Sequence, residues 1–430
     1  MTLIILNILI WLGPFFLSLR KGTIHTLHPQ FMMPIFIIYF ILNSYIQDQT
    51  NWMNEGTRAI IVGIVQLLPG LDPESFSFDK ALLICALSGI FFHIGSSVFN
   101  KPIYNSINDY IYLNKTKIIN RNKNLVTITC IIISSIVWLP NYFIPSLAHG
   151  TFWTFPLALS VCFIPIAMFE ISKLTFFITL VVALFVANYV LLSKAAFGFI
   201  LIPIILYFLF FHFNFLKFFI KKSYFKNFVI FSLLFSLFIG ALFFGNQYGK
   251  LDTRKLFRRD YAFEIFAILV ESKKLGLIEY EKSWIKNELF QTFPSILYKK
   301  KTTGEHINPA KRVALELFPT EATGPRANTY WNRHMLFAGY YDLGIFGSLI
   351  GAFFYGLFLS YFWKLTKTKI KKYEAKWPIF VYLPLPSFGV YFLACGNFAY
   401  PVINTTISSI ILYIIFWSAR LGFSKNAITK

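Results

Sequence analysis

The stretch MLFAGYYDLGIFGSLIGAFFYGLFLSYFW, residues 335–363, decides the class of fold. It is longer than the roughly 20 helical residues that cross a hydrocarbon core of about 30 Å. It is the ninth of eleven apolar runs, which lie near residues 2–19, 30–46, 79–98, 125–146, 153–171, 174–193, 195–213, 227–246, 335–363, 378–396 and 402–419. The sequence therefore predicts an all-α integral membrane protein with about eleven transmembrane helices.

The composition agrees with this class. Hydrophobic residues make up 56% of the 430 residues and charged residues only 14%, so the chain is more apolar than a soluble domain of this length. The net charge of +21 comes mainly from short basic tracts between apolar runs, where cations contact lipid headgroups and fix topology. We therefore expect a lipid bilayer as the partner and no nucleic acid.

Two other features of the sequence argue against a signal peptide, disulfides and a cysteine metal site. The first apolar run lacks a basic segment before it and a small-residue cleavage site after it, so we expect a retained helix and not a signal peptide. The four cysteines lie inside apolar runs without paired spacing, which predicts core residues and neither disulfides nor a metal site.

The short basic connectors predict the topology. These connectors are residues 20–21, 99–124, 214–226, 364–377 and the tail. An even number of apolar runs separates each connector from the next, so all five can lie on the cytoplasmic side. The N-terminus is then outside and the C-terminus cytoplasmic. Three parts follow: a bundle of about eight helices over 1–247, a large outward loop over 248–333, and a bundle of about three helices over 334–430.

The outward loop is the only long polar segment, with 16 Lys and Arg against 10 Asp and Glu. Apolar and acidic residues recur at helical spacing over 256–275, with Gly276 as a possible C-cap. A second amphipathic helix fits residues 280–292. Later prolines and glycines break any long element.

Cations gather on the predicted outer face, namely Lys194, Arg254, Arg258, Arg259, Arg326 and Arg333. Arginine donates bidentate, charge-assisted hydrogen bonds to phosphate oxygens, so this set suits a phosphate-bearing ligand. The alternative is structural: cations beside a membrane helix contact headgroups, and Arg258 and Arg259 could pair with Asp260 or Glu264. Tyr330 and Trp331 suit either an interfacial aromatic belt or a sugar-binding platform.

Motifs for metal or nucleotide chemistry are absent from the sequence: there is no Asp-x-Asp, HExxH, GxGxxG or phosphate-binding glycine loop with lysine. No His/Cys cluster has metal-ligand spacing either. We therefore expect no metal and no other cofactor.

The architecture and three motifs resemble Wzy-type polysaccharide polymerases, the oligosaccharide repeat unit polymerases of O-antigen and capsule. The motifs are Ser193-Lys194-Ala195, the run from Arg333-His334-Met335 to Tyr341-Asp342-Leu343-Gly344, and Gly344-Ile345-Phe346-Gly347. Arg333 precedes Gly344 with the Arg-to-Gly spacing of outward loops in some members. The resemblance implies a membrane-embedded, metal-independent glycosyltransferase of the class C type in the bacterial inner membrane.

Such an enzyme joins oligosaccharide repeats linked to polyprenyl (undecaprenyl) diphosphate into O-antigen of lipopolysaccharide or a related surface polysaccharide. The resemblance also implies a chain-length regulator and a flippase as partners. In this hypothesis Arg258, Arg259 and Arg333 hold the leaving diphosphate, and Tyr330 and Trp331 hold sugar. His334 is the first candidate for the base that deprotonates the acceptor, followed by Glu264 and Asp260.

Two other functions remain open at this stage. An O-antigen ligase would use the same lipid-linked donor and the same cations. A flippase or transporter of lipid-linked sugars would place cations within its membrane-spanning runs. These runs contain almost no charge, which favours chemistry at the outer surface.

Overall fold

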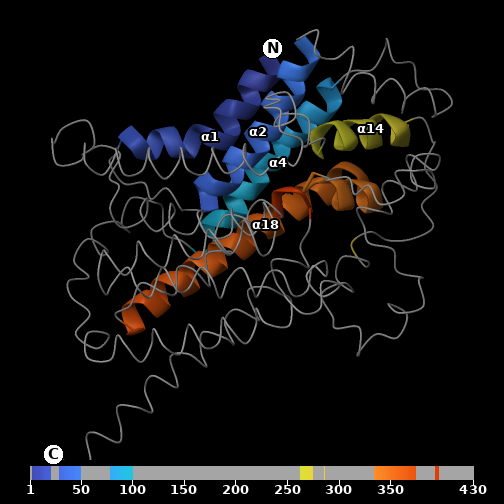
Figure 1. Cartoon of the computed structure of the whole chain (residues 1–430). Coiled ribbons are helices and arrows are strands. Elements are labelled where there is room, and N and C mark those ends of the chain that lie inside the picture. The colour runs from blue at the N-terminus through green and yellow to red at the C-terminus, as the bar shows by residue number, and fades with distance from the viewer. Residues whose placement is uncertain are drawn as a thin grey trace, which may run out of the picture.

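The computed structural model describes five helices (Figure 1). The described residues are 2–20, 29–49, 78–99, 262–274, 285, 334–373 and 393–396. The helices are α1 (Thr2–Arg20), α2 (Pro29–Gln49), α4 (Asp79–Ser97), α14 (Ala262–Lys274) and α18 (Phe337–Tyr373). Within these ranges the fold is all-helical, as the sequence predicts.

Four of these helices, α1, α2, α4 and α18, coincide with predicted apolar runs, and those four predictions are confirmed as helices. Within the described part of the chain, two segments are long and apolar enough to cross a membrane, Asp79–Ser97 and Phe337–Thr366. The described part is therefore compatible with an all-α membrane protein. Of the other seven predicted runs, six lie outside the described residues, and of the run 378–396 only residues 393–396 are described.

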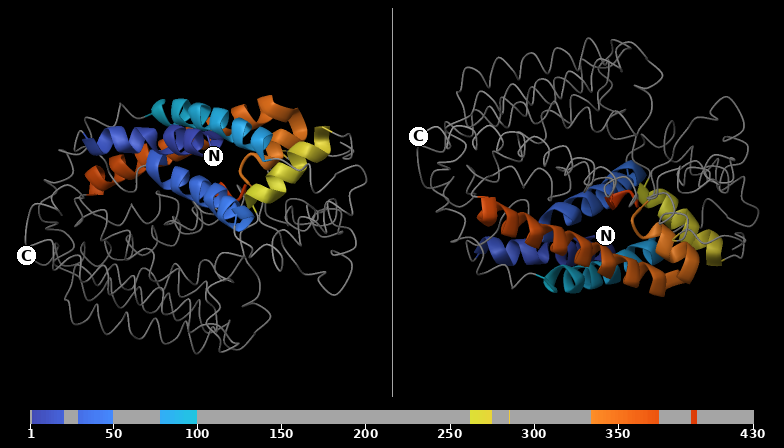
Figure 2. Two further views of the ribbon diagram at one scale, coloured as in Figure 1. Left: turned by 90° about the horizontal axis from the view of Figure 1, so that it is seen from above. Right: turned by 90° about the horizontal axis from the view of Figure 1, so that it is seen from below.

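Helices α4 and α18 form the closest pair and run in the same direction (Figure 2). Glycines bring their backbones together: a Cβ at Gly95 would overlap the carbonyl of Phe353, and a Cβ at Gly356 would overlap the carbonyl of Phe92. Small residues permit this approach, which is how helices associate inside a bilayer. The pair is fixed by backbone contact and cannot slide without a clash.

Helix α1 packs against α4 through buried polar groups. The side-chain amide of Asn7 donates to the carbonyl of Leu82 at 2.9 Å, and the indole Nε1 of Trp11 donates to the carbonyl of Cys85 at 3.1 Å. Both partners advance along the chain together, so α1 is also parallel to α4. The Asn7 amide also donates to the carbonyl of Leu3 on its own helix at 2.8 Å, whereas the Trp11 bond satisfies an indole N–H that lipid could not satisfy.

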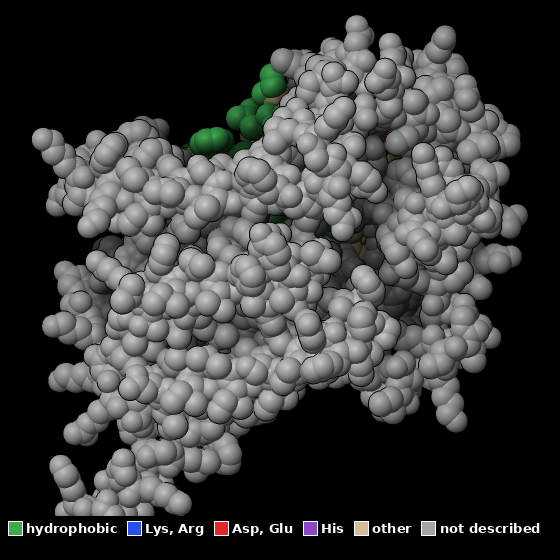
Figure 3. All heavy atoms as spheres, viewed as in Figure 1, with side chains coloured by type: hydrophobic (Ala, Val, Ile, Leu, Met, Phe, Trp, Pro, Cys, Tyr) green, Lys and Arg blue, Asp and Glu red, His purple; other side chains and the backbone are tan. Residues whose placement is uncertain are grey.

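The two faces of α4 differ in polarity in the sense expected for a helix in lipid. Its exposed side carries large apolar residues at helical spacing: Leu83, Leu87, Ile90, Phe91, Ile94 and Val98. Its buried side carries small and polar residues, including Ser88, Gly89 and Ser96. A soluble helix shows the reverse arrangement. In the view of Figure 3 the visible side chains of the described helices are mainly hydrophobic.

Helix α18 differs from the single straight helix expected over residues 335–363. Gly344 has φ 65° and ψ −144°, a conformation that side chains disfavour, and it breaks the helix. The short segment before the break folds back, so that Gly339 and Gly347 meet backbone to backbone. Beyond residue 363 the helix continues to Tyr373, into the tract predicted as a cytoplasmic connector.

Candidate functional site

The described residue that sequence analysis ranked first, His334, lies at the junction of three helices. It directly precedes α18, and its ring is fully buried. Phe266 of α14 stacks on the ring at 5.4 Å between centroids, Phe263 meets it edge-on at 5.9 Å, and Phe40 of α2 meets it at 6.3 Å. The ring is thus enclosed by aromatic groups from segments distant in the sequence. We call Phe40, Phe263, Phe266 and His334 the His334 cluster.

The polar atoms of the His334 ring have unequal surroundings. The backbone N–H of Leu336 donates to Nδ1 at a long 3.4 Å, which leaves the proton on Nε2. Nε2 is buried and has no hydrogen-bond partner among the described residues. Burial lowers the pKa of the imidazole from 6.5 to about 3, because the charged form would lose its hydration. His334 is therefore neutral at physiological pH.

Hydrogen bonds hold the chain that follows His334. The N–H of Met335 donates to the carbonyl of Ala394 at 2.8 Å, and the N–H of Phe337 donates to the carbonyl of His334 at 2.9 Å. The hydroxyl of Ser348 reaches the carbonyl of Leu336 at 3.4 Å. These contacts anchor the entry to α18, which Arg333 immediately precedes in the sequence.

Helix α14 brings the first part of the large loop against the other helices. It lies beside the bent end of α18 and also contacts α2 and α4 (Figure 1). The helix predicted over 256–275 is present as Ala262–Lys274. Glu264, the second candidate base, is only 2% exposed, whereas the sequence left open that it sits on a solvated helix face. The structure thus places Glu264 on the same helix as two members of the His334 cluster.

A carboxylate that sequence analysis did not select joins the loop to α18. Oδ2 of Asp342 accepts a hydrogen bond from the backbone N–H of Ile285 at 2.8 Å. Ile285 is helical and falls within the helix predicted over 280–292. Asp342 is the one acidic residue in the apolar run 335–363, and this isolated charge was the sequence signal for a contact with the loop.

The remaining predicted site residues are Lys194, Arg254, Arg258, Arg259, Asp260, Arg326, Tyr330, Trp331 and Arg333, and all lie outside the described residues. Their grouping stays a prediction. Among the described residues, no group of three or more His, Cys, Asp or Glu side chains could hold a metal ion.

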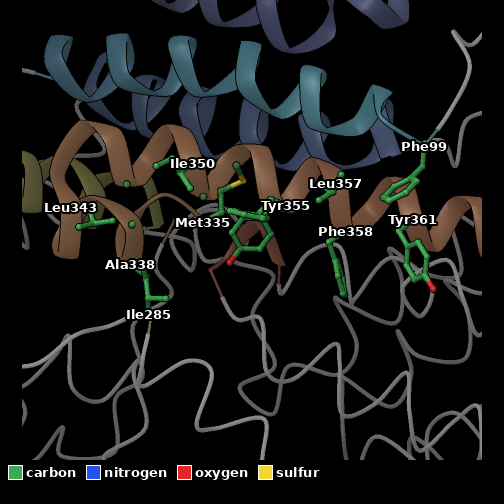
Figure 4. Close-up of a pocket in the computed structure, with 14 residues that line it drawn as sticks. Phe99, Ile285, Met335, Ala338, Leu343, Ile350, Tyr355, Leu357, Phe358 and Tyr361 are labelled. Atoms are coloured by element: carbon green, nitrogen blue, oxygen red, sulfur yellow. The ribbon is translucent and has the colours of Figure 1, made fainter.

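A cavity of about 650 Å³ lies along α18. Figure 4 shows its lining side chains along α18, with Ile285, Ala338 and Leu343 at one end and Phe99 and Tyr361 at the other. Met335, which follows His334, also lines it. Every lining residue is aliphatic, aromatic or glycine, so the cavity suits an apolar ligand of the size that protein pockets commonly hold.

Comparisons with known proteins return no match: no family model, no curated protein and no solved structure is significantly similar to this chain.

Proposed function

We propose that the protein is a membrane-embedded glycosyltransferase that polymerises polyprenyl-diphosphate-linked oligosaccharide repeats on the outer face of a bacterial inner membrane. The proposal starts from the sequence resemblance and the outer-face cations. The structural observation that supports it most is the conformation and packing of residues 334–344. These residues are the part of the Arg-to-Gly motif that the structure describes.

That segment supplies a physical reason for the motif spacing. Gly344 takes a backbone conformation that favours glycine, and Gly339 meets Gly347 where a side chain would clash. His334 is enclosed by aromatic rings at the other end of the segment. We propose that this rigid unit holds the residue before it, Arg333, in the defined position that a preorganised cation requires.

The directions of the helices are consistent with the proposed topology. Helices α1, α4 and α18 are parallel, and each is predicted to run from outside to inside. Phe99 and Tyr361, which adjoin the basic tracts 99–124 and 364–377, pack together at 5.5 Å. At the other end, Phe78 of the α4 entry stacks on Phe263 of the loop helix. Segments proposed for one side of the membrane thus lie together.

The reaction transfers the anomeric carbon of the donor sugar from diphosphate to an acceptor hydroxyl. The bond from this carbon to the diphosphate oxygen breaks, and the diphosphate leaves with the electron pair. The acceptor oxygen forms the new glycosidic bond, and its proton passes to a base. Arg333, with Arg258 and Arg259, stabilises the charge that develops on the diphosphate, an effect that typically contributes about 2.7–4 kcal/mol per donor.

The role of His334 changes in this proposal. A base works best with a pKa near the operating pH, whereas burial lowers the pKa of His334 to about 3. Its ring packing suits a residue that positions Arg333. Proton transfer is then proposed for a carboxylate, with Glu264 or Asp260 as the candidates.

The experiment is deletion of the gene in its host, followed by gel analysis of surface polysaccharide after complementation with wild type or Arg333→Ala. Wild type should restore a ladder, and Arg333→Ala at equal protein level should leave a single repeat unit. Unattached polymer in the deletion strain would identify a ligase. An unchanged ladder would remove polysaccharide assembly and return the cations to lipid anchoring.

A further inference from the structure

The cavity along α18 has the dimensions of a lipid chain. The part of its lining from Ile350 to Tyr361 follows one face of the helix over about 17 Å at 1.5 Å per residue. One leaflet of a hydrocarbon core is about 15 Å deep, half of the 30 Å total. This part of the cavity therefore matches the depth of one leaflet.

One end of the cavity carries a cation. Nζ of Lys364 lies 5.3 Å from the centroid of the Phe99 ring, which lines the cavity beside Tyr361. Lys364 is exposed, and no carboxylate among the described residues forms a salt bridge with it. The following helical residues include further lysines at 367, 369, 371 and 372. The apolar cavity therefore ends beside the positive charge of Lys364.

From these features we infer that the cavity holds one chain of an anionic phospholipid whose headgroup phosphate is bound at Lys364. An apolar lining of one-leaflet length together with a cation at its end is complementary to this ligand. The polyprenyl diphosphate of the proposed reaction would carry its charge at the opposite end of α18. The inference needs only that α4 and α18 span a bilayer, and so does not rest on the proposed enzymatic activity.

The test uses the purified full-length protein with phosphatidylglycerol and phosphatidylcholine of the same chains. Native mass spectrometry counts retained lipid, and phosphatidylglycerol with a diazirine on its chain maps the contact. Gly351 lines the cavity, and a Cβ there meets no atom within 4 Å. Gly351→Leu should therefore fill the cavity without a clash. Gly13→Leu on α1 is the matched control, because Gly13 has equally open surroundings.

Wild type should retain phosphatidylglycerol over phosphatidylcholine by about fivefold, the preference that one lysine near a membrane surface supplies. Lys364→Gln should bring this preference close to unity, and Lys364→Arg should keep it. Gly351→Leu should reduce retention of both lipids, whereas Gly13→Leu should not. Diazirine labels should fall between residues 350 and 361.

Three results would overturn the inference: labels confined to other segments, equal retention by Gly351→Leu and Gly13→Leu, or displacement of the label by a polyprenyl phosphate. The last would assign the cavity to the polyprenyl chain. If Gly351→Leu does not fold, the label map and the two Lys364 variants decide the matter. None of these readouts measures polysaccharide, so loss of the proposed enzymatic function would leave this result intact.

Discussion

Replacement of His334 by Asn should remove a specific part of the acid sensitivity of this protein. Asn keeps an acceptor oxygen where Nδ1 accepts from Leu336, but it does not titrate. The folded-state pKa of His334 is lowered to about 3, below the ordinary 6.5. Between these values the unfolded chain binds a proton that the folded chain does not, so stability is full above pH 6.5 and falls as the pH decreases.

The expected magnitude follows from the size of this window. At pH 5 the unfolded imidazole is about 1.5 pH units below its pKa, which costs the folded state about 2 kcal/mol relative to pH 7.5. Wild type should therefore lose about 2 kcal/mol more than His334→Asn between pH 7.5 and pH 5. Unfolding by denaturant in mixed micelles, followed by tryptophan fluorescence, measures this difference.

The control concerns Glu264, a buried titratable group on the same helix as Phe263 and Phe266. The comparison is repeated with Glu264→Gln in both proteins, which separates the two titrations in a double-mutant cycle. Parallel pH profiles for wild type and His334→Asn, in either background, would refute the argument. They would show that His334 is hydrated in solution and that the aromatic enclosure opens.

Three further substitutions, two of them compared with a control substitution, test the helix structure and contacts by the same unfolding measurement. Gly344→Ala should lower the free energy of unfolding by about 1–3 kcal/mol because of the positive φ. Gly351→Ala, in open space within the helix, should raise it by up to about 1 kcal/mol. Equal effects of the two substitutions would contradict the break in α18. Gly95→Ala should cost about 1–3 kcal/mol because its Cβ overlaps the Phe353 carbonyl, and an effect no larger than that of Gly13→Ala would show that α4 and α18 are not in contact. Trp11→Phe should cost about 1 kcal/mol through loss of the bond to Cys85, and no loss would place water at that carbonyl.

The positions of the helices could be predicted from the sequence because length and hydropathy are local properties. Their detailed form could not. The window 335–363 marks the apolar part of α18, but the helix continues to Tyr373. The residues beyond 363 are rich in lysine, which is a good helix former but gives no hydropathy signal. The break at Gly344 gives no hydropathy signal, because glycine is frequent in membrane helices.

In the candidate site, too, the sequence singled out a residue but did not predict how that residue is packed. His334 attracted attention because it follows Arg333 at the end of a basic loop, and that context predicted an accessible base. Its burial depends on Phe40 and Phe263, which are distant in the sequence. Local periodicity carries no information on such contacts, so burial and the lowered pKa appear only in the folded chain.

The contacts around His334 form a closed set, and this determines how activity data should be interpreted. Helix α4 is fixed to α18 by the glycine contacts, Phe78 before α4 stacks on Phe263 of α14, and Phe263 packs on His334 before α18. Displacement of α4 from α18 should therefore move the entry to α18, a segment that begins one residue after Arg333 in the sequence. Under the proposed function, shorter polymer from a folded Gly95→Ala protein would be an indirect effect of the displaced helices, whereas a direct loss through Arg333→Ala would leave the unfolding free energy unchanged. Measuring stability and polymer length on both variants separates a residue that acts on the substrate from one that positions it.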